Sequence, residues 1–404
     1  MKLRIKRRTQ TGWLMRLLLL MPFLQFWLPS GVKFAADGAW VLLVIYLLRF
    51  RKNLDWAKLG CLPGWVLAFL GLCLAVYLVK YQSGLYFLWG LRNQFRFYGA
   101  FFAFALFLTP EDLEDYRRTF DRLFWLDVLV SLVQFYGFGL KGDRLGGLFG
   151  YRQGCNGYTN LFFALVVTEA VVFCLERKER PACCVVKCIA ALYVAALAEL
   201  KFYFVEFLLI LVLVVLLTDF SWRKVGILLV GCAAAVAFAA LIDKLFPKFE
   251  GWFSLKWLLE TAASEKGYAS AGDLNRLTAV SGINRRVFRT WGQRVFGLGL
   301  GNCEYSGWAA MTTPFYRRFS YLHYTWMSVA FVYLETGYLG LAFFFGFFFL
   351  VYRRRGQSGW CRVGKIMAVL CALIAVYNSS LRTEAGYLAC FALAAPFASD
   401  RRML

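Results

Sequence analysis

Long apolar runs separated by short polar segments dominate the pattern of this chain. Most runs are close to the ~20 residues that an α-helix needs to cross a hydrocarbon layer of ~30 Å. Twelve such runs can be distinguished, at residues 12–28, 34–50, 62–79, 97–109, 123–140, 158–175, 182–200, 201–218, 225–244, 326–351, 363–380 and 385–398. The pattern predicts an all-α polytopic membrane protein with about 12 transmembrane helices.

Basic residues are distributed unevenly between the two predicted sides of the membrane. If the N-terminus is inside, the inner segments hold about 22 Lys and Arg and the short outer segments about nine. Lys and Arg accumulate on the cytoplasmic side, so this asymmetry predicts that both termini are cytoplasmic. The net charge of +22 then reflects topology, and nucleic acid is not an expected partner. The basic start resembles a secretory signal, but no small-residue cleavage site follows, so we expect an uncleaved first helix.

One segment between runs, 245–325, is too long for a simple connection and is predicted to be extracytoplasmic. We therefore divide the chain into an N-terminal membrane bundle of about nine helices (1–244), this loop subdomain (245–325), and C-terminal helices that complete the same bundle (326–404). Residues 253–261 are expected to form a short helix. The glycines at 297, 299 and 301 predict a turn with bare backbone, where another segment can approach closely.

His323 is the only histidine of the chain and lies where an apolar run begins. Its ordinary pKa is near neutrality, which suits proton transfer at physiological pH. The alternative is an amphipathic residue at the membrane interface without any chemistry.

Arginines gather in the predicted outer segments. Arg92 and Arg96 are four positions apart, on one face of a helix. Guanidinium groups have the best geometry for phosphate and diphosphate, so a cationic outer face indicates an anionic substrate. For any single arginine, contact with lipid headgroups is the alternative. Glu199, Lys201 and Glu206 form a polar cluster at the top of adjoining spans that is either an ion pair of helix packing or functional. Glu335 is expected to be buried, where it orients a neighbouring group or hydrogen-bonds within the bundle.

Resident metals and nucleotides are not expected. Most of the twelve cysteines lie inside apolar runs and no CxxC or His/Cys ligand set occurs, so we predict no metal and no cofactor. The glycines at 297–301 lack both the GxGxxG spacing and the Lys-Ser/Thr of a phosphate loop. Cys155 and Cys303 both fall in predicted outer loops, where a disulfide between them is an open alternative.

The order of these features resembles the O-antigen ligase and Wzy-type O-antigen and capsular polysaccharide polymerase superfamily. That order is Arg276, the turn Gly297-Leu-Gly-Leu-Gly301-Asn-Cys-Glu, His323, and a helix with Leu334-Glu-Thr-Gly-Tyr-Leu-Gly-Leu341. Upstream, Arg144-Leu-Gly-Gly-Leu-Phe-Gly150 with Asn156 and Asn160 is similar to its Arg-x-x-Gly-x-Phe-x-x-x-Asn segment, and Leu91-Arg-Asn-Gln-Phe-Arg96 resembles a basic helix entry of polymerases. The resemblance covers residues 85–345. The glycine turn and Glu199-Leu-Lys201 depart from the ligases and look more like capsular or exopolysaccharide polymerases.

The resemblance implies a GT-C-like membrane glycosyltransferase in a bacterial cytoplasmic membrane, with a polyprenyl-diphosphate-linked glycan as donor and another as acceptor. By position, His323 and Arg276 correspond to the catalytic residues. The candidate substrate-binding residues are Arg92, Arg96, Arg144, Asn156, Glu199, Lys201, Arg285 and Glu304. Further partners implied are the lipid bilayer, a flippase and a chain-length regulator.

Polymerisation of lipid-linked repeat units into a surface polysaccharide is the function that we expect from these features. The nearest alternative is a ligase that transfers finished glycan from polyprenyl diphosphate to another acceptor. A lipid-linked sugar flippase is an alternative of another class, but carriers often show inverted repeats, and none is visible here. A scaffold without catalysis would leave the outer arginines unexplained.

Overall fold

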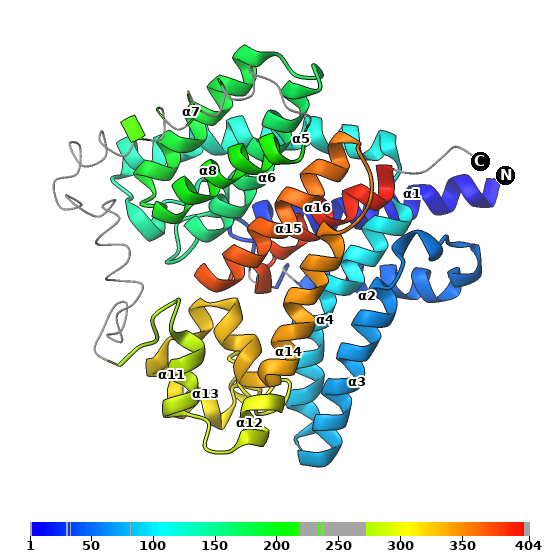
Figure 1. Cartoon of the computed structure of the whole chain (residues 1–404), viewed down its shortest axis with the longest axis vertical. Coiled ribbons are helices and arrows are strands. Elements are labelled where there is room, and N and C mark those ends of the chain that lie inside the picture. The colour runs from blue at the N-terminus through cyan, green and yellow to red at the C-terminus, as the bar shows by residue number, and fades with distance from the viewer. Residues whose placement is uncertain are drawn as a thin grey trace.

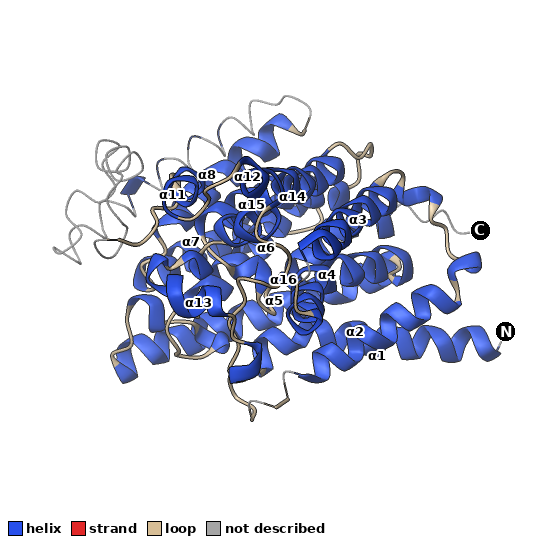
Figure 2. Ribbon diagram, turned by 90° about the horizontal axis from the view of Figure 1, so that it is seen from below, coloured by secondary structure: helices blue, strands red, loops and turns tan. Residues whose placement is uncertain are grey.

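The structure is a computed structural model that describes residues 2–29, 31–32, 34–80, 82–218 and 272–399, with isolated positions between 226 and 237. Within these residues every regular element is a helix and no strand occurs (Figure 2). The expected helix at 253–261 lies outside the described residues.

Eight helices form the first part of the bundle. They are α1 (Lys2–Leu24), α2 (Phe34–Arg49), α3 (Leu62–Lys80), α4 (Gly84–Phe107), α5 (Pro110–Leu132), α6 (Asn156–Leu175), α7 (Pro181–Leu197) and α8 (Lys201–Leu216). The short span predicted at 97–109 is wrong in its extent, because it is the C-terminal part of the 24-residue α4. That helix ends before Thr109, which caps α5 in a reciprocal arrangement with Asp112.

After residue 272 the chain forms three short helices and three long ones. These are α11 (Ala279–Arg286), α12 (Trp291–Phe296), α13 (Pro314–Phe319), α14 (Ser328–Tyr352), α15 (Gly359–Tyr377) and α16 (Gly386–Ser399). In the described part of the chain four helices are long and apolar enough to cross a membrane: α3, α6, α14 and α15. α7 and α16 are apolar but shorter. The fold is therefore that of an all-helical, membrane-embedded protein.

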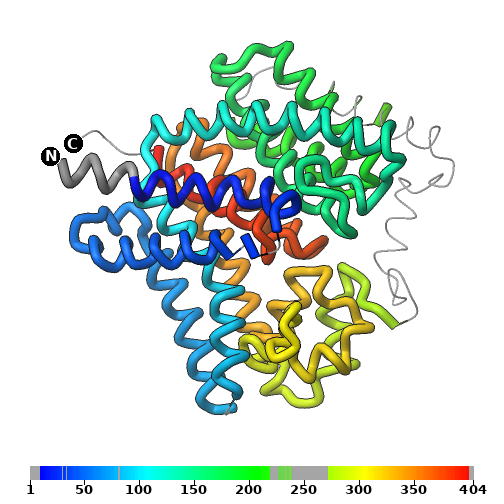
Figure 3. Tube along the Cα trace, turned by 180° about the vertical axis from the view of Figure 1, so that it is seen from behind, coloured from blue at the N-terminus to red at the C-terminus, as the bar shows by residue number. Residues whose placement is uncertain are grey.

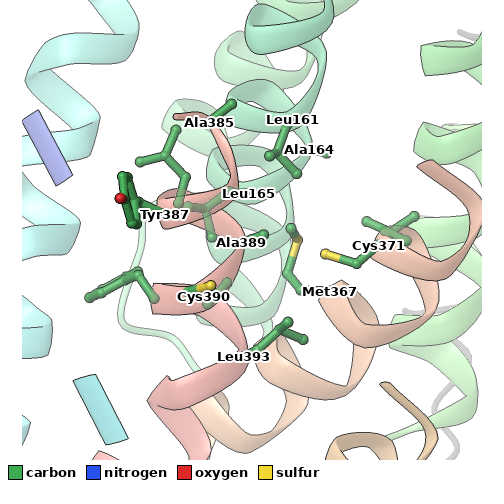
Figure 4. Packing of buried hydrophobic residues seen from close by; sticks show 14 of the residues in the cluster. Leu161, Ala164, Leu165, Met367, Cys371, Ala385, Tyr387, Ala389, Cys390 and Leu393 are labelled. Atoms are coloured by element: carbon green, nitrogen blue, oxygen red, sulfur yellow. The ribbon is translucent and has the colours of Figure 1, made fainter. Parts of the chain in front are cut away.

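α6 lies in the middle of the molecule, and nearly its whole length is buried. α16 packs against α4 on one side and α15 on the other, and α15 also contacts α14 and α6 (Figures 1 and 3). In the core, Leu161 and Leu165 of α6 lie near Ala385 and Ala389 at the start of α16, and Cys371 of α15 belongs to the same apolar cluster (Figure 4). Small residues and thiols at these contacts let the helices approach closely.

The short helices α11 to α13 lie beside the first half of α14, at the lower left of Figure 1. They share with it a second apolar cluster, which includes Leu274, Ile283, Phe288, Tyr324 and Leu334. A backbone hydrogen bond from Leu274 N to Leu322 O, 3.0 Å long, joins the start of this region to its end.

A break in α14 receives the glycine turn. Gly337 has φ +65° inside α14, which interrupts the helix. The carbonyl groups of Leu334 and Glu335 therefore do not accept from the N–H groups four residues later, as they would in a regular helix. They accept instead from Leu298 N at 2.7 Å and from Gly299 N at 2.8 Å. The close approach predicted for this turn is confirmed, because a Cβ on Gly301 would lie 1.9 Å from Tyr86 O of α4. The turn thus fixes α4 and α14 against each other.

Candidate functional site

Six charged residues from separate segments meet at one end of the bundle, and we call them the arginine cluster. They are Asp37 (α2), Arg92 and Arg96 (α4), Glu304 (after the glycine turn), Arg382 at the end of the short helix η10 (Ser380–Arg382), and Glu384, just before α16. Because α4 begins at Gly84, its two arginines lie within a helix and not at its entry.

Arg96 is the most deeply buried member, at 3% exposure. Its Nη1 atom lies 3.8 Å from Asp37 Oδ1 and 3.5 Å from Glu384 Oε1. Its Nη2 group donates to the carbonyl oxygen of Arg382 at 3.1 Å. Arg92 donates to both carboxylate oxygens of Asp37, from Nε at 3.1 Å and from Nη2. The prediction that Arg92 and Arg96 share one helix face is confirmed, since both reach Asp37.

Arg382 is the third arginine of the cluster. Its Nη2 group donates to Glu304 Oε1 at 2.8 Å and its Nη1 group to Gln94 Oε1 at 3.0 Å. Its guanidinium carbon lies 3.6 Å from the ring centre of Phe331. Burial raises the pKa of the Glu304 carboxyl above its ordinary value, although the charge of Arg382 acts in the opposite direction.

A second polar group lies where α7 turns into α8. Arg276 places its guanidinium carbon 3.9 Å from the ring centre of Tyr377, and Tyr377 stacks on Phe202 at 4.2 Å. Lys201 is close enough to Arg276 for the two cations to repel each other, and Glu199 attracts Lys201. Glu199 itself has φ +56°, which the tight turn between α7 and α8 imposes on it.

The first turn of α6 connects the two groups. Asn156 donates to Asp143 Oδ1 at 3.1 Å and to the carbonyl oxygen of Ala198 at 3.2 Å, beside Glu199. Ser380 of η10 donates to the carbonyl oxygen of Gly157 at 2.8 Å. The Tyr158 hydroxyl donates to Glu384 Oε2 at 3.3 Å, in the arginine cluster. One helix end therefore holds both groups, and the positive end of the helix dipole lies there.

His323 lies between two short 3₁₀ turns, in the left-handed region at φ +50°. Its imidazole stacks on Trp326 with 4.0 Å between ring centres. The contact between Leu274 and Leu322 brings the segment of His323 next to that of Arg276. The imidazole is half-buried and forms no hydrogen bond or ion pair with another side chain among the residues described. It is therefore available to a ligand.

The remaining candidates are placed less centrally. Arg144 is exposed on the short helix η4 (Gly142–Arg144). The loop that contains this helix is anchored by a hydrogen bond from Leu148 N to Asp127 Oδ1, 2.6 Å long. Arg285 is exposed in the last turn of α11. Glu335 is 1% exposed, as expected, and its Oε1 atom accepts from Gly301 N at 3.0 Å and Cys303 N at 3.2 Å. It orients the glycine turn.

The disulfide considered between Cys155 and Cys303 is not formed, and both are free, buried thiols. Cys155 lies under the loop after α5 and donates to the carbonyl oxygen of Gly150 at 3.4 Å. The backbone N–H of Cys303 donates to Glu335 Oε1, and the Tyr324 hydroxyl donates to the carbonyl oxygen of Cys303 at 2.7 Å. No group of three or more His, Cys, Asp or Glu side chains suited to a metal ion occurs in the ranges that the structure covers.

Asp37, Arg382 and Glu384 were not among the candidate residues that the sequence predicted for the site. A signal was present, since Arg382 and Glu384 fall in the short polar segment between the last two apolar runs. Charge at such a position is costly and needs a partner. Asp37 carried no comparable signal. A single carboxylate at a predicted helix start is explained by its attraction to the positive end of the helix dipole, so it indicates no further partner.

The fold and this site define a helical membrane protein with a polar centre of paired charges and aromatic rings at one end. No family model, curated protein or solved structure matches the chain.

Proposed function

We propose that this protein is a membrane glycosyltransferase that polymerises polyprenyl-diphosphate-linked oligosaccharide repeat units into a surface polysaccharide, as in the O-antigen ligase and polymerase superfamily that it resembles. The observation that carries the proposal is the position of Arg276. It lies near a second cation, Lys201, at the α7–α8 turn that Asn156 of α6 contacts, while its chain segment adjoins His323. Two cations that repel each other are stabilised together by an anion, and a diphosphate suits both.

The reaction assigns a role to each part of this centre. The acceptor hydroxyl attacks the anomeric carbon of the donor glycan, and the bond from that carbon to the diphosphate oxygen breaks. Arg276 and Lys201 offset the charge that develops on the leaving diphosphate. His323 takes the proton of the acceptor hydroxyl. Arg92, Arg96 and Arg382 hold the surrounding walls through their carboxylate partners.

Exposed aromatic rings beside the arginine cluster support a glycan as the substrate. Trp308 is 58% exposed and stacks on Phe34, with ring centres 5.6 Å apart. Trp89 lies 6.3 Å from Trp308, and the guanidinium carbon of Arg92 lies 4.9 Å from the ring centre of Trp89. Flat rings of this kind present an apolar face to the C–H groups of a sugar ring, while neighbouring arginines can donate to its hydroxyl oxygens and carboxylates can accept from its hydroxyl groups.

The contacts at the other end of the bundle support the proposed topology of twelve spans with both termini cytoplasmic. Lys58 donates to the carbonyl oxygen of Phe397 at 3.1 Å, and Arg354 donates to the carbonyl oxygen of Lys58 at 2.6 Å. Arg362 pairs with Glu176 at 2.9 Å. Segments that the charge pattern assigns to the inside thus contact one another, whereas the candidate site gathers residues from outer segments. On this topology the site is extracytoplasmic.

The test is the length of glycan on the lipid carrier in a deletion strain that carries the native protein, His323→Ala, Arg276→Ala or Arg318→Ala. Arg318 is an exposed arginine of α13 and serves as the matched control. We expect long chains with the native protein and the control, and single repeat units with the other two variants at equal membrane levels. Long chains in both site variants would reject the site. Long lipid-linked chains in the deletion strain would indicate a ligase, and the absence of outward-facing lipid-linked sugar would indicate a transporter.

A further inference from the structure

A cavity of about 510 Å³ lies at the other end of α6 from the candidate site, between α5, the α6–α7 connection and α7. Its size is in the range of small-molecule sites, roughly 300–1,000 Å³. α6 has 20 residues, so about 30 Å of helix separates this cavity from Asn156. The cavity therefore belongs to a different part of the molecule from the proposed glycan site.

Along α5 and α7, the side chains that line the cavity change from charged to apolar. On α5 the charged residues that line the cavity are Arg117 and Asp121, and Trp125, one turn further on, begins its apolar wall. On the other side Arg180 directly precedes Pro181, the first residue of α7, and Val186 continues the apolar wall. A change from charged to apolar surface, with a tryptophan at the border, is typical of the headgroup level of a membrane.

The floor of the cavity is held in place by a network of ion pairs. Lys187 lies 2.7 Å from Asp121 Oδ1 and 2.6 Å from Glu179 Oε1, and its side chain is only 5% exposed. Arg117 contacts the other oxygen of Glu179 at 3.4 Å. A further carboxyl, Glu169, lies deeper on α6 at 2% exposure and does not line the cavity. The floor is thus preformed and largely neutralised by its own partners.

The rim carries positive charge that the floor does not neutralise. Arg180 is exposed and forms no ion pair with any residue that the structure describes. Lys178 is paired with Glu176 at 2.9 Å, but its side chain remains 61% exposed. The lining as a whole has four cations and two carboxylates, so its net charge is +2. An anionic headgroup therefore fits the rim better than a neutral one.

A stripe of exposed apolar side chains continues from the cavity along α5. On α5 and the π-helical turn that extends it (Val133–Gly137), Trp125, Leu129 and Val133 are four positions apart and 41%, 58% and 49% exposed, which makes them one stripe. At the far end the hydroxyl groups of Tyr136 on the α5 extension and Tyr193 on α7 are hydrogen-bonded to each other. From Trp125 to Tyr136 the helix rises about 16 Å, most of the length of an extended acyl chain.

We infer that this cavity binds an anionic phospholipid. The phosphate lies against Arg180 and Lys178 at the rim, and one acyl chain follows the stripe of Trp125, Leu129 and Val133 toward the Tyr136–Tyr193 contact. The positive rim and the apolar stripe together match an amphiphile, whereas a soluble phosphate would use the rim alone.

Native mass spectrometry of the full protein tests this inference, with phosphatidylglycerol and phosphatidylethanolamine of identical acyl chains supplied at equal concentration. We expect the native protein to retain one phosphatidylglycerol in preference. The double variant Lys178→Ala/Arg180→Ala should bind phosphatidylglycerol roughly 30-fold more weakly, because each cation near an anionic lipid contributes about a fivefold factor. The matched control is Lys52→Ala/Arg355→Ala, which removes two exposed cations outside the cavity and should bind as the native protein does.

Two further measurements separate the sources of binding. Trp125→Ala should weaken retention of both lipids, because it removes apolar wall and leaves the rim charge intact. Free glycerol phosphate should not compete with the lipid at equal concentration. Equal retention of both lipids by the native protein, equal losses in the rim and control variants, or full competition by glycerol phosphate would each overturn the inference. Size-exclusion profiles identify any variant that fails to fold. If the rim variant fails, Arg180→Lys replaces it; this variant keeps the charge and should bind phosphatidylglycerol as the native protein does.

Discussion

Arg382 donates a hydrogen bond of 2.8 Å to Glu304, and this pair joins the turn before α16 to the loop that follows the glycine turn. Both side chains are largely buried, at 11% and 6% exposure. The loop region that carries His323 is therefore tied to the helical bundle by a charge pair as well as by apolar contacts.

Removing one member of this pair should be costly. Arg382→Ala leaves Glu304 buried without its cation, and such a change typically costs about 3–5 kcal/mol. The double variant Arg382→Met/Glu304→Gln leaves no unpaired charge and should regain most of that loss. Unfolding in mixed detergent micelles measures both. A double variant no more stable than Arg382→Ala would show that the pair does not act as a unit.

The pH dependence of stability should contain a contribution from Glu304. Its pKa is raised in the folded protein, so the folded state binds more protons than the unfolded state above the unfolded value of about 4.3. The free energy of unfolding then falls as the pH rises through the interval between the two pKa values. Glu304→Gln cannot titrate, so the E304Q variant should gain stability relative to the native protein across this interval. Melting curves at several pH values test the sign, and a relative loss would contradict the raised pKa.

Glu335 should be required for the shape of the glycine turn. Its Oε1 atom accepts two backbone N–H groups, from Gly301 and Cys303. Glu335→Gln keeps an oxygen that can accept both, and we expect a small effect. Glu335→Leu leaves both N–H groups unsatisfied, at about 1–3 kcal/mol each. The two variants are compared by thermal unfolding, and equal stability would show that these hydrogen bonds contribute little.

Gly301 should tolerate no side chain. It has φ +86°, and a Cβ there would lie 1.9 Å from Tyr86 O, a backbone atom that cannot move away without shifting α4. We expect Gly301→Ala to reduce the amount of folded protein severely. Gly307→Ala is the matched control, because a Cβ at that position meets no atom within 4 Å. Equal yields of monodisperse protein from both variants would refute the close contact.

Trp308 should contribute to glycan binding without supporting the fold. It is exposed and stacks only at the surface, on Phe34 and near Trp89. Trp308→Ala should weaken the binding of a repeat-unit oligosaccharide by roughly tenfold, about 1.4 kcal/mol, while the melting temperature stays close to native. Titration with the oligosaccharide tests this, and Trp291→Ala, at an exposed tryptophan of α12, is the control. Equal affinity in the two variants would remove Trp308 from the glycan site.

Several local features were predictable because they depend on neighbours in sequence. The all-helical membrane class follows from the apolar runs, and the close approach at the glycine turn follows from three glycines at alternate positions. The common face of Arg92 and Arg96 follows from helical periodicity. The extent of α4 was not predictable in the same way, because polar residues in its first half interrupt the apolar pattern while the helix continues through them.

The sequence by itself determined that the chain is helical, membrane-embedded and rich in basic residues, because composition, periodicity and hydropathy can be read without the fold. Only the tertiary structure decided which charges meet. Asp37, Arg96 and Arg382 lie on different segments, and helix packing alone sets the distances between them. The same holds for Cys155 and Cys303, which are buried beneath different segments and remain thiols. Burial makes an unpaired charge costly, so the packing that brings α2, α4 and η10 together also selects the partner of each arginine.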